Sequence, residues 1–203
     1  MNQDQGSEAA GYHQPVLADE VVELMAPVVP GVVVDATFGG GGHTRRMLDE
    51  FGDEVTVVAI DRDPEAVANA AGLPILVIEG NFSDIDTLVT PVVDGPVAGV
   101  LFDFGVSSHQ LDEATRGFSY HRDGPLDMRM GPDAGITAHQ VVNEWAADDL
   151  ARIIRTYGEE PLARRIATAI VAARPIESTA ALSTVIAQAM PAARRRAGHP
   201  ARR

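Results

Sequence analysis

The sequence has 203 residues, of which 45% are hydrophobic and 22% charged, as in an ordinary globular domain or a domain with a large insertion. No apolar run approaches the roughly 20 residues of a membrane helix. The amino-terminal stretch MNQDQGSEAAGYHQ has neither the basic start nor the apolar core of a secretion signal. The absence of cysteine excludes disulfides and thiolate metal sites, and we expect a cytoplasmic protein with no membrane contact.

The net charge of −13 is unevenly distributed along the chain. Residues 1–150 carry a balance of −20, residues 151–203 carry +7, and every basic residue is arginine. A basic segment on an acidic body indicates a localised anionic partner, for which RNA is the obvious candidate. Charge alone leaves open the alternative of solvated helix faces followed by a basic tail.

Helix and strand patterns alternate in the first half of the chain, after a polar stretch at 1–11 that predicts a disordered tail. The apolar spacing predicts helices at 16–25, 43–51 and 83–89 and a further helix that opens at Asp63, with Asp63 and Ser83 as caps. It predicts strands at 32–34, 55–60, 73–78 and 97–102. This alternation predicts a parallel sheet built from right-handed crossovers. The strands are nearly continuous apolar runs, so we expect helices on both faces of the sheet.

The pattern changes after Asp103. Residues 104–135 are rich in Gly, Asp, Arg and Pro and show little periodicity. From Thr137 onward only helices are predicted, at 137–145, 147–157, 161–173 and 178–190, with Thr137 and Ser178 as caps.

The strongest local motif runs from Asp35 to His43, in the sequence DATFGGGGH. An acidic residue ends a strand, and glycines lead into a helix whose start presents free N–H groups and a positive dipole end. Such a loop can hold a pyrophosphate or the methionine part of S-adenosylmethionine. The dinucleotide pattern fails because Thr44 or Arg45 stands where its third glycine belongs, and the Walker pattern fails because no lysine follows. The remaining D-x-x-x-G-x-G form is typical of methyltransferases, while a purely structural glycine turn stays open.

Three further residues follow the next strands. Asp61 lies 22 positions after Gly39, where an acid can accept hydrogen bonds from both ribose hydroxyls of an adenosine, while Asp63 is the better helix cap. Phe82 can flank an adenine or pack in the core. Asp103 ends the fourth strand, at the point where ligands bind in open parallel sheets, and we expect it beside the sulfonium and the methyl acceptor.

Seven segments together resemble the ribosomal RNA small-subunit methyltransferase H family. They are YHQPVLADEVV, VVDATFGGGGHT, AIDRDPEA, GNFSDI, LFDFGVSSHQLDEATRGFSYHRDGPLDMRM, TYGEEPLARRIATAIV and GHPARR. The resemblance implies a class I methyltransferase fold, a Rossmann-like α/β parallel sheet with an inserted all-helical domain. It also implies methyl transfer from S-adenosylmethionine to N4 of a cytidine in 16S ribosomal RNA or the small ribosomal subunit.

The resemblance further implies a set of cofactor residues, and no metal ligand. The set comprises Gly41, Gly42, His43, Asp61, Phe82, Asp103 and Gln110. His43 and Gln110 rest on the resemblance alone. It implies a cofactor-binding core at 12–110 and a loop with a helical substrate-recognition region at 111–203. The oligomeric state is not predicted.

Members of the family are longer, so the chain is expected to stop at the end of the helical insertion. The sheet would then be partial, and the strand at 97–102 would leave an open edge. A truncated, non-catalytic remnant that binds RNA or the ribosome is therefore the alternative function. A nucleotide-dependent oxidoreductase is disfavoured by the missing third glycine.

Methylation of a cytosine N4 needs an acceptor for its N–H groups, because its lone pair is delocalised into the ring. Candidates are the Asp103 carboxylate and the backbone carbonyls of 104–106. For RNA contact, the loop at 111–130 offers Arg116, Phe118, Tyr120, His121, Arg122 and Arg129, which could equally brace the loop itself. Better candidates for an electrostatic footprint are Arg164, Arg165, Arg194, Arg195 and Arg196.

Overall fold

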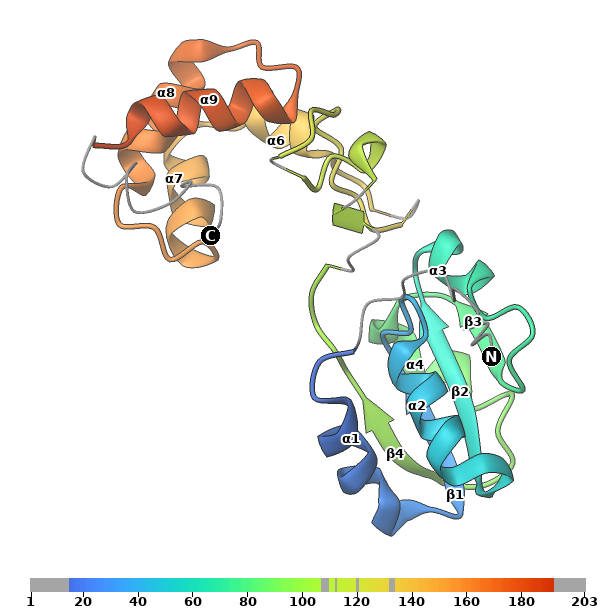
Figure 1. Ribbon diagram of the computed structural model, residues 1–203. Helices are drawn as coiled ribbons and strands as arrows, with labels where there is room; N and C mark the ends of the chain where they lie inside the picture. Colours follow the sequence, from blue (N-terminus) through green and yellow to red (C-terminus); the bar gives the residue numbers. More distant parts are fainter. Residues whose placement is uncertain (1–14, 107–109, 112, 120, 132–133, 192–203) are drawn as a thin grey trace, which may run out of the picture. The chain divides into compact units, whose positions relative to one another are not determined.

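The computed structural model describes residues 15–106, 110–111, 113–119, 121–131 and 134–191. The chain divides into two compact units, Met1–Ser107 and Ser108–Arg203 (Figure 1). The tail predicted at 1–11 lies outside the described residues. Among the described helices none is long and apolar enough to cross a membrane.

The first unit contains a four-stranded, fully parallel sheet in the order β3-β2-β1-β4 (Figure 1). Its strands are β1 (Gly31–Asp35), β2 (Val55–Asp61), β3 (Leu76–Glu79) and β4 (Val97–Leu101). The chain moves outward from β1 to β3 and then returns to the other side of β1. The strand order therefore reverses between β1 and β4, as the α/β prediction requires.

Helices cover both faces of this sheet, as the apolar strands predicted. They are α1 (Ala18–Met25), α2 (Gly42–Phe51), α3 (Pro64–Ala68) and α4 (Ile85–Val89). Side chains alternate along a strand, so neighbouring valines of β1 serve different layers. Val33 packs with Met47 of α2 on one face, and Val34 packs with Val89 of α4 on the other.

Among the boundaries that differ from the sequence prediction, two in the first unit have a clear local cause. β3 begins at Leu76 rather than at Leu73, because Gly72 turns with φ +83° and Pro74 has no N–H for a sheet hydrogen bond. Ser83 is not a helix cap. The Asn81 side chain accepts the Ser83 N–H at 3.0 Å and starts a 3₁₀ turn, and α4 begins only after this turn.

β4 is the outer strand of the sheet in the part of the chain that the structure describes, as expected for an open edge. Val97, Val100 and Phe102 leave about 40% of their surface exposed along it. Val97 and Val100 pair with β1 residues of the α4-covered face. That face of the sheet is therefore incompletely covered at β4.

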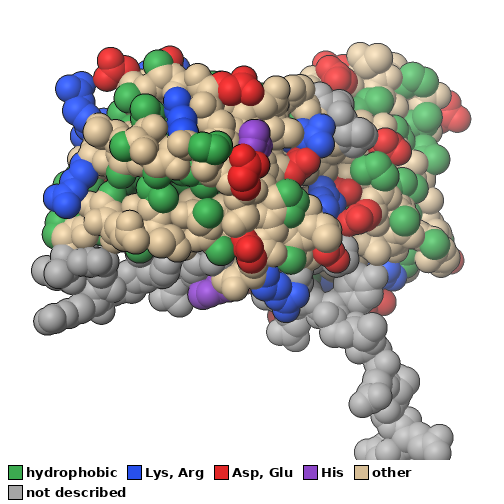
Figure 2. Space-filling view, turned by 90° about the horizontal axis from the view of Figure 1, so that it is seen from above, with side chains coloured by type: hydrophobic (Ala, Val, Ile, Leu, Met, Phe, Trp, Pro, Cys, Tyr) green, Lys and Arg blue, Asp and Glu red, His purple; other side chains and the backbone are tan. Residues whose placement is uncertain are grey.

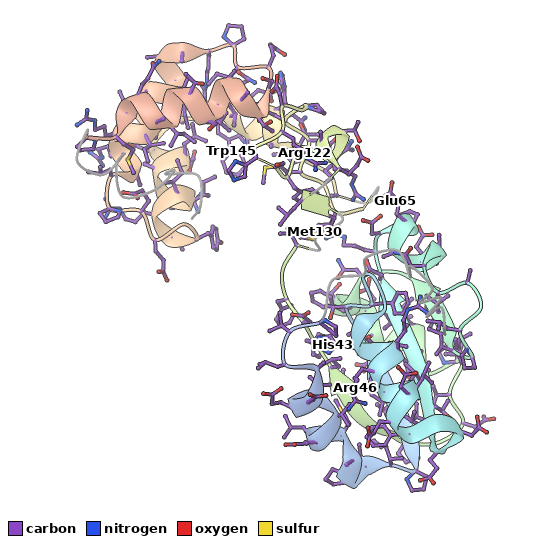
Figure 3. All side chains as sticks on the ribbon, viewed as in Figure 1. His43, Arg46, Glu65, Arg122, Met130 and Trp145 are labelled. Carbon is purple, nitrogen blue, oxygen red and sulfur yellow. The ribbon has the colours of Figure 1, made fainter. Side chains whose placement is uncertain are left out.

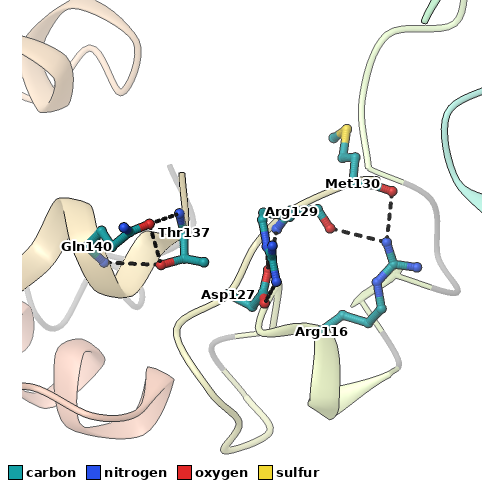
Figure 4. A network of polar contacts seen from close by, with 6 residues as sticks. All are labelled: Arg116, Asp127, Arg129, Met130, Thr137 and Gln140. Carbon is teal, nitrogen blue, oxygen red and sulfur yellow. Dashed lines mark hydrogen bonds and ion pairs between the residues drawn. The ribbon is translucent and has the colours of Figure 1, made fainter. Parts of the chain in front are cut away.

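The second unit is helical from Thr137 onward, as predicted, with α6 (Ala138–Glu144), α7 (Ala147–Thr156), α8 (Ala163–Ala173) and α9 (Thr179–Ala189). Thr137 and Gln140 form a reciprocal capping box on α6 (Figure 4), and Ser178 caps α9. The buried residues Leu150, Ile166 and Ile170 join α7 to α8. α8 begins two residues later than predicted, since the Glu160 carboxylate accepts the Leu162 N–H and holds a turn there.

Candidate functional site

Asp35 at the end of β1 fastens the glycine loop to the sheet. Its carboxylate accepts the Thr44 hydroxyl at 2.7 Å and the Thr37 N–H at 3.3 Å, and its side chain is almost fully buried. Burial raises the pKa of the Asp35 carboxyl, against the effect of the Thr44 hydrogen bond. Both oxygens are thus engaged inside the protein, which makes Asp35 a structural residue of the motif.

The glycine loop has a backbone conformation that side chains oppose. Gly39 and Gly41 lie in the left-handed region, at φ +53° and +74°. A Cβ on Gly41 would come within 2.7 Å of the Phe38 ring, whereas a Cβ on Gly39 would meet nothing closer than 3.9 Å. Gly41 begins α2, and no side chain among the described residues caps this helix start. The loop therefore leaves helix N–H groups available for an acceptor outside the chain.

Asp61 at the end of β2 supports the same loop from the other side. Its Oδ2 accepts the Gly39 N–H at 2.7 Å, and its Oδ1 accepts the Asp63 N–H at 2.9 Å. Asp63 caps α3 by accepting the Glu65 N–H, as predicted. A carboxylate offers about four acceptor positions, so Asp61 keeps capacity for two further donors. This capacity suits a pair of neighbouring hydroxyl groups.

The start of α2, where Figure 3 labels His43, lies close to the end of β4, because His43 approaches Asp103. His43 Nε2 lies 3.5 Å from Asp103 Oδ2, and the His43 side chain is 9% exposed against 53% for Asp103. The Asp103 N–H also donates to the Thr37 hydroxyl at 2.7 Å. Within the described part of the chain, the buried Nδ1 of His43 has no hydrogen-bond partner. The tips of β1 and β4 and the helix start are thereby joined in one polar cluster.

Phe82 belongs to an exposed aromatic cluster at this edge of the sheet. Its ring centroid lies 5.7 Å from that of Phe102 and 5.6 Å from that of Phe104, and these two rings stack at 5.4 Å. Phe82 is 38% exposed and Phe104 is 70% exposed, so the core-packing alternative for Phe82 is wrong. Sequence reasoning missed Phe102 and Phe104, although aromatic residues on both sides of Asp103 at a strand end were a usable signal.

Six of the seven predicted cofactor residues lie in the first unit, at or after the carboxyl ends of strands. They are Gly41, Gly42, His43, Asp61, Phe82 and Asp103. Gln110 is buried in the second unit, so its role toward a cofactor stays a prediction. In the described ranges no three acidic or histidine side chains are grouped to hold a metal ion.

Two arginines predicted for RNA contact instead brace the loop before α6 (Figure 4). Arg129 forms a two-pronged pair with the Asp127 carboxylate at 2.8 and 2.7 Å. Arg116 donates to the carbonyls of Arg129 and Met130 at 3.2 and 3.0 Å. The bracing alternative therefore holds for Arg116 and Arg129. Tyr120 and Arg194, Arg195 and Arg196 lie outside the described residues.

Known proteins are similar to this chain over almost its whole length. Ribosomal RNA small subunit methyltransferase H of Heliobacterium modesticaldum is 44% identical over 95% of this chain, and that of Frankia alni is 47% identical over 94%. The chain spans 65% and 63% of the lengths of these two relatives. A solved structure from Clostridium thermocellum matches 44% of this chain and 54% of its own at 23% identity with a TM-score of 0.35, a likeness too low to carry an argument.

The family model described as the MraW methylase family matches residues 10–203, which is nearly the entire sequence. The parallel sheet and the glycine loop at its strand tips agree with a methylase fold. The chain therefore belongs to the MraW methylase family.

Proposed function

We propose that this chain carries the cofactor site and a substrate-binding helical region of a methyltransferase that acts on N4 of a cytidine in 16S ribosomal RNA. The observation that carries the proposal is the meeting of an uncapped glycine helix start, Asp61 and Asp103 at neighbouring strand tips. The names of the relatives support the ribosomal RNA substrate. The cytoplasmic location expected from the sequence belongs to the same proposal.

The residues present fit S-adenosylmethionine as cofactor. The Gly41 N–H donates to the Phe38 carbonyl at 2.8 Å, so the uncapped N–H groups of the first turn of α2, from Gly42 onward, are the ones that suit its carboxylate, because a helix start favours an anion. The remaining acceptor positions of Asp61 suit its ribose hydroxyls, and the exposed ring of Phe82 suits one edge of its adenine. When bound, the cofactor supplies a methyl group on a sulfonium, which needs no metal for activation.

We assign the proton acceptor of the reaction to Asp103. Its carboxylate is half exposed at the strand end, and His43 approaches one of its oxygens. In the reaction the N4–methyl bond forms while the sulfur–methyl bond breaks. N4 must then release one proton, which the free oxygen of Asp103 can accept. The backbone carbonyls of 104–106 are the competing acceptors, and Asp103→Asn distinguishes them because it removes only the carboxylate.

The test has two parts that use the chain as it is. Titration calorimetry with S-adenosylmethionine measures cofactor binding, and radiolabelled transfer to small ribosomal subunits measures activity. We expect binding in the wild type and in Asp103→Asn, with transfer lost in the variant. Full turnover by Asp103→Asn would exclude the carboxylate as the acceptor. Binding without any transfer, restored by a chain extended past Arg203, would favour the non-catalytic remnant for this length.

A further inference from the structure

The helical unit contains a groove of about 840 Å³ between α8 and α9. Its floor is made of small apolar side chains, among them Ala169, Ala172 and Ala173 of α8 and Val185 of α9. In Figure 2 hydrophobic side chains gather in a furrow at the left, and arginine side chains stand at its outer end. Nothing in the cofactor chemistry proposed above uses this groove.

The charged side chains that line the groove are both basic. Arg164 and Arg165 belong to its lining, and no acidic residue does among the described residues. Arg164 is 84% exposed, and its ion-pair partner among the described residues is Asp148 at 3.9 Å, itself 94% exposed. An exposed pair at this distance contributes little. The two guanidinium groups are therefore available to an anion.

These two arginines differ from Arg155 and Arg174 of the helical unit. Arg174 donates to the carbonyls of Val142 and Trp145, and Arg155 donates to the carbonyl of Pro161. Such side chains are held by their own backbone. Arg164 and Arg165 instead flank an apolar floor, which combines charge attraction with a surface for flat groups.

We propose that the α8–α9 groove binds a single-stranded segment of RNA, an inference that rests on the proposed function for the choice of RNA. Guanidinium groups match phosphate oxygens in a two-pronged geometry, and the apolar floor accepts the faces of sugars and bases. Thr168 already donates its hydroxyl to the Arg164 carbonyl, and the alanines offer no hydrogen bonds. The groove therefore recognises the backbone and shape of the strand more than its base sequence.

The test measures fluorescence anisotropy of a labelled single-stranded RNA of about 12 nucleotides, within the usual site range, against the full chain at several salt concentrations. The double variant R164A/R165A should weaken binding roughly tenfold and lower the salt slope by about 1.4, the value for two phosphate contacts on a single strand. The matched control is R46A/R152A, which removes the same charge from α2 and α7, outside the groove lining. We expect the control to change the affinity much less.

A third variant tests the apolar floor of the groove separately from its two arginines. Ala172 is exposed in the groove, so Ala172→Trp fills the floor without altering a charge or a buried contact. It should weaken RNA binding roughly fivefold, on the scale of one stacked base, and leave the salt slope unchanged. Thermal melting checks that the variant is folded.

Equal losses in R164A/R165A and R46A/R152A, or wild-type affinity in the filled groove, would overturn the proposal. So would a labelled acidic peptide that binds this groove in place of RNA. Calorimetry with S-adenosylmethionine separates the two proposals. If S-adenosylmethionine binds but the groove variants do not change the RNA affinity, only the groove proposal is wrong. If RNA affinity depends on the groove but S-adenosylmethionine does not bind, only the proposed function is wrong.

Discussion

The strand tips of the first unit are held by carboxylates, whereas loops beside α6 in the second unit are also held by arginines. At the strand tips of the first unit, Asp35 and Asp61 accept hydrogen bonds from loop donors. In the second unit, Arg116 and Arg174 donate to backbone carbonyls. A carboxylate that holds a turn keeps acceptor capacity for a ligand, as at Asp61. A guanidinium that is used on its own backbone loses much of its value toward a phosphate.

This difference changes how the basic carboxyl-terminal part should be interpreted. The balance of +7 over residues 151–203 counts all ten arginines of the segment, although the sequence prediction named only Arg164, Arg165 and Arg194, Arg195 and Arg196 as the electrostatic footprint. The structure divides them by their partners, since Arg155 and Arg174 serve backbone carbonyls while Arg164 and Arg165 line a groove. The number of arginines in a segment therefore overestimates its electrostatic footprint.

The largest expected effect is on the free energy of unfolding, at the glycine loop. This loop is held by its left-handed backbone conformation, which neither a carboxylate nor a guanidinium elsewhere can replace. Gly41→Ala places a Cβ at φ +74°, and this Cβ would lie 2.7 Å from the Phe38 ring. We expect a loss of about 2–4 kcal/mol in the free energy of unfolding, from left-handed strain plus overpacking. Urea unfolding measures it.

Gly39→Ala is the matched control for the loop. It carries the same kind of left-handed strain at φ +53°, but its Cβ would enter open space. We expect a loss of about 1–2 kcal/mol from the strain alone. If both variants lost the same stability, the contact with the Phe38 ring would contribute nothing.

The next effect is on ligand binding at Asp61. Asp61→Ala removes the acceptor proposed for the ribose hydroxyls, and calorimetry should show a loss of about 1.5–3 kcal/mol in S-adenosylmethionine binding. The variant also frees the N–H groups of Gly39 and Asp63, so some loss of stability is expected. Unchanged cofactor affinity would rule out the ribose role.

Asp63→Ala distinguishes a ligand residue from a structural one. It removes the cap of α3 and should cost about 0.5–2 kcal/mol of stability. Because its carboxylate faces the Glu65 N–H, we expect cofactor affinity to stay near the wild-type value. A large loss of affinity in this variant would mean that loop stability, rather than direct contact, explains the effect at Asp61.

Much of the fold was predictable because its signals are local. The apolar runs predicted the four strands of the parallel sheet, because periodicity is a local property of the sequence. The Asp63 and Thr137 caps predicted two helix starts, because a cap accepts a hydrogen bond from a backbone N–H nearby in sequence. The errors came from competition between neighbours. Asn81 took the capping role expected of Ser83, because an Asn side chain can hold the N–H two positions on.

The candidate site was predictable only where strand ends determine it. Asp61 and Asp103 followed from their positions after apolar runs, because parallel strands bring their carboxyl ends to one edge. The approach of His43 to Asp103 joins residues 60 positions apart, and no sequence pattern encodes that distance. The α8–α9 groove depends on how two helices pack, which alanine spacing alone does not determine.

A smaller effect is expected from the buried acid of the first unit, through pH. The folded pKa of Asp35 is raised by burial above its unfolded value, so its contribution to stability is complete below the unfolded pKa of about 3.9. That contribution is lost as the pH rises through the raised folded pKa. The difference in unfolding free energy between wild type and Asp35→Asn should therefore shift in favour of the variant from pH 4 upward. A pH-independent difference would contradict a desolvated carboxyl.

The smallest effect is at Asp127, where Arg129 holds the loop before α6. The Arg129 hydrogen bond lowers the pKa of the Asp127 carboxyl, so the pair stabilises the fold above the unfolded pKa and is lost as the pH falls through the lowered one. Arg129→Ala should lower the free energy of unfolding only slightly at neutral pH, since the pair is partly exposed, and should leave it almost unchanged in strong acid. Arg152→Ala, which breaks an exposed pair with Asp149, should cost less.

If Arg129 only braces the loop, its loss leaves RNA affinity unchanged in the anisotropy assay. A drop as large as that of R164A/R165A would show that a guanidinium engaged with its own loop still binds RNA, and would break the contrast between the two kinds of arginine.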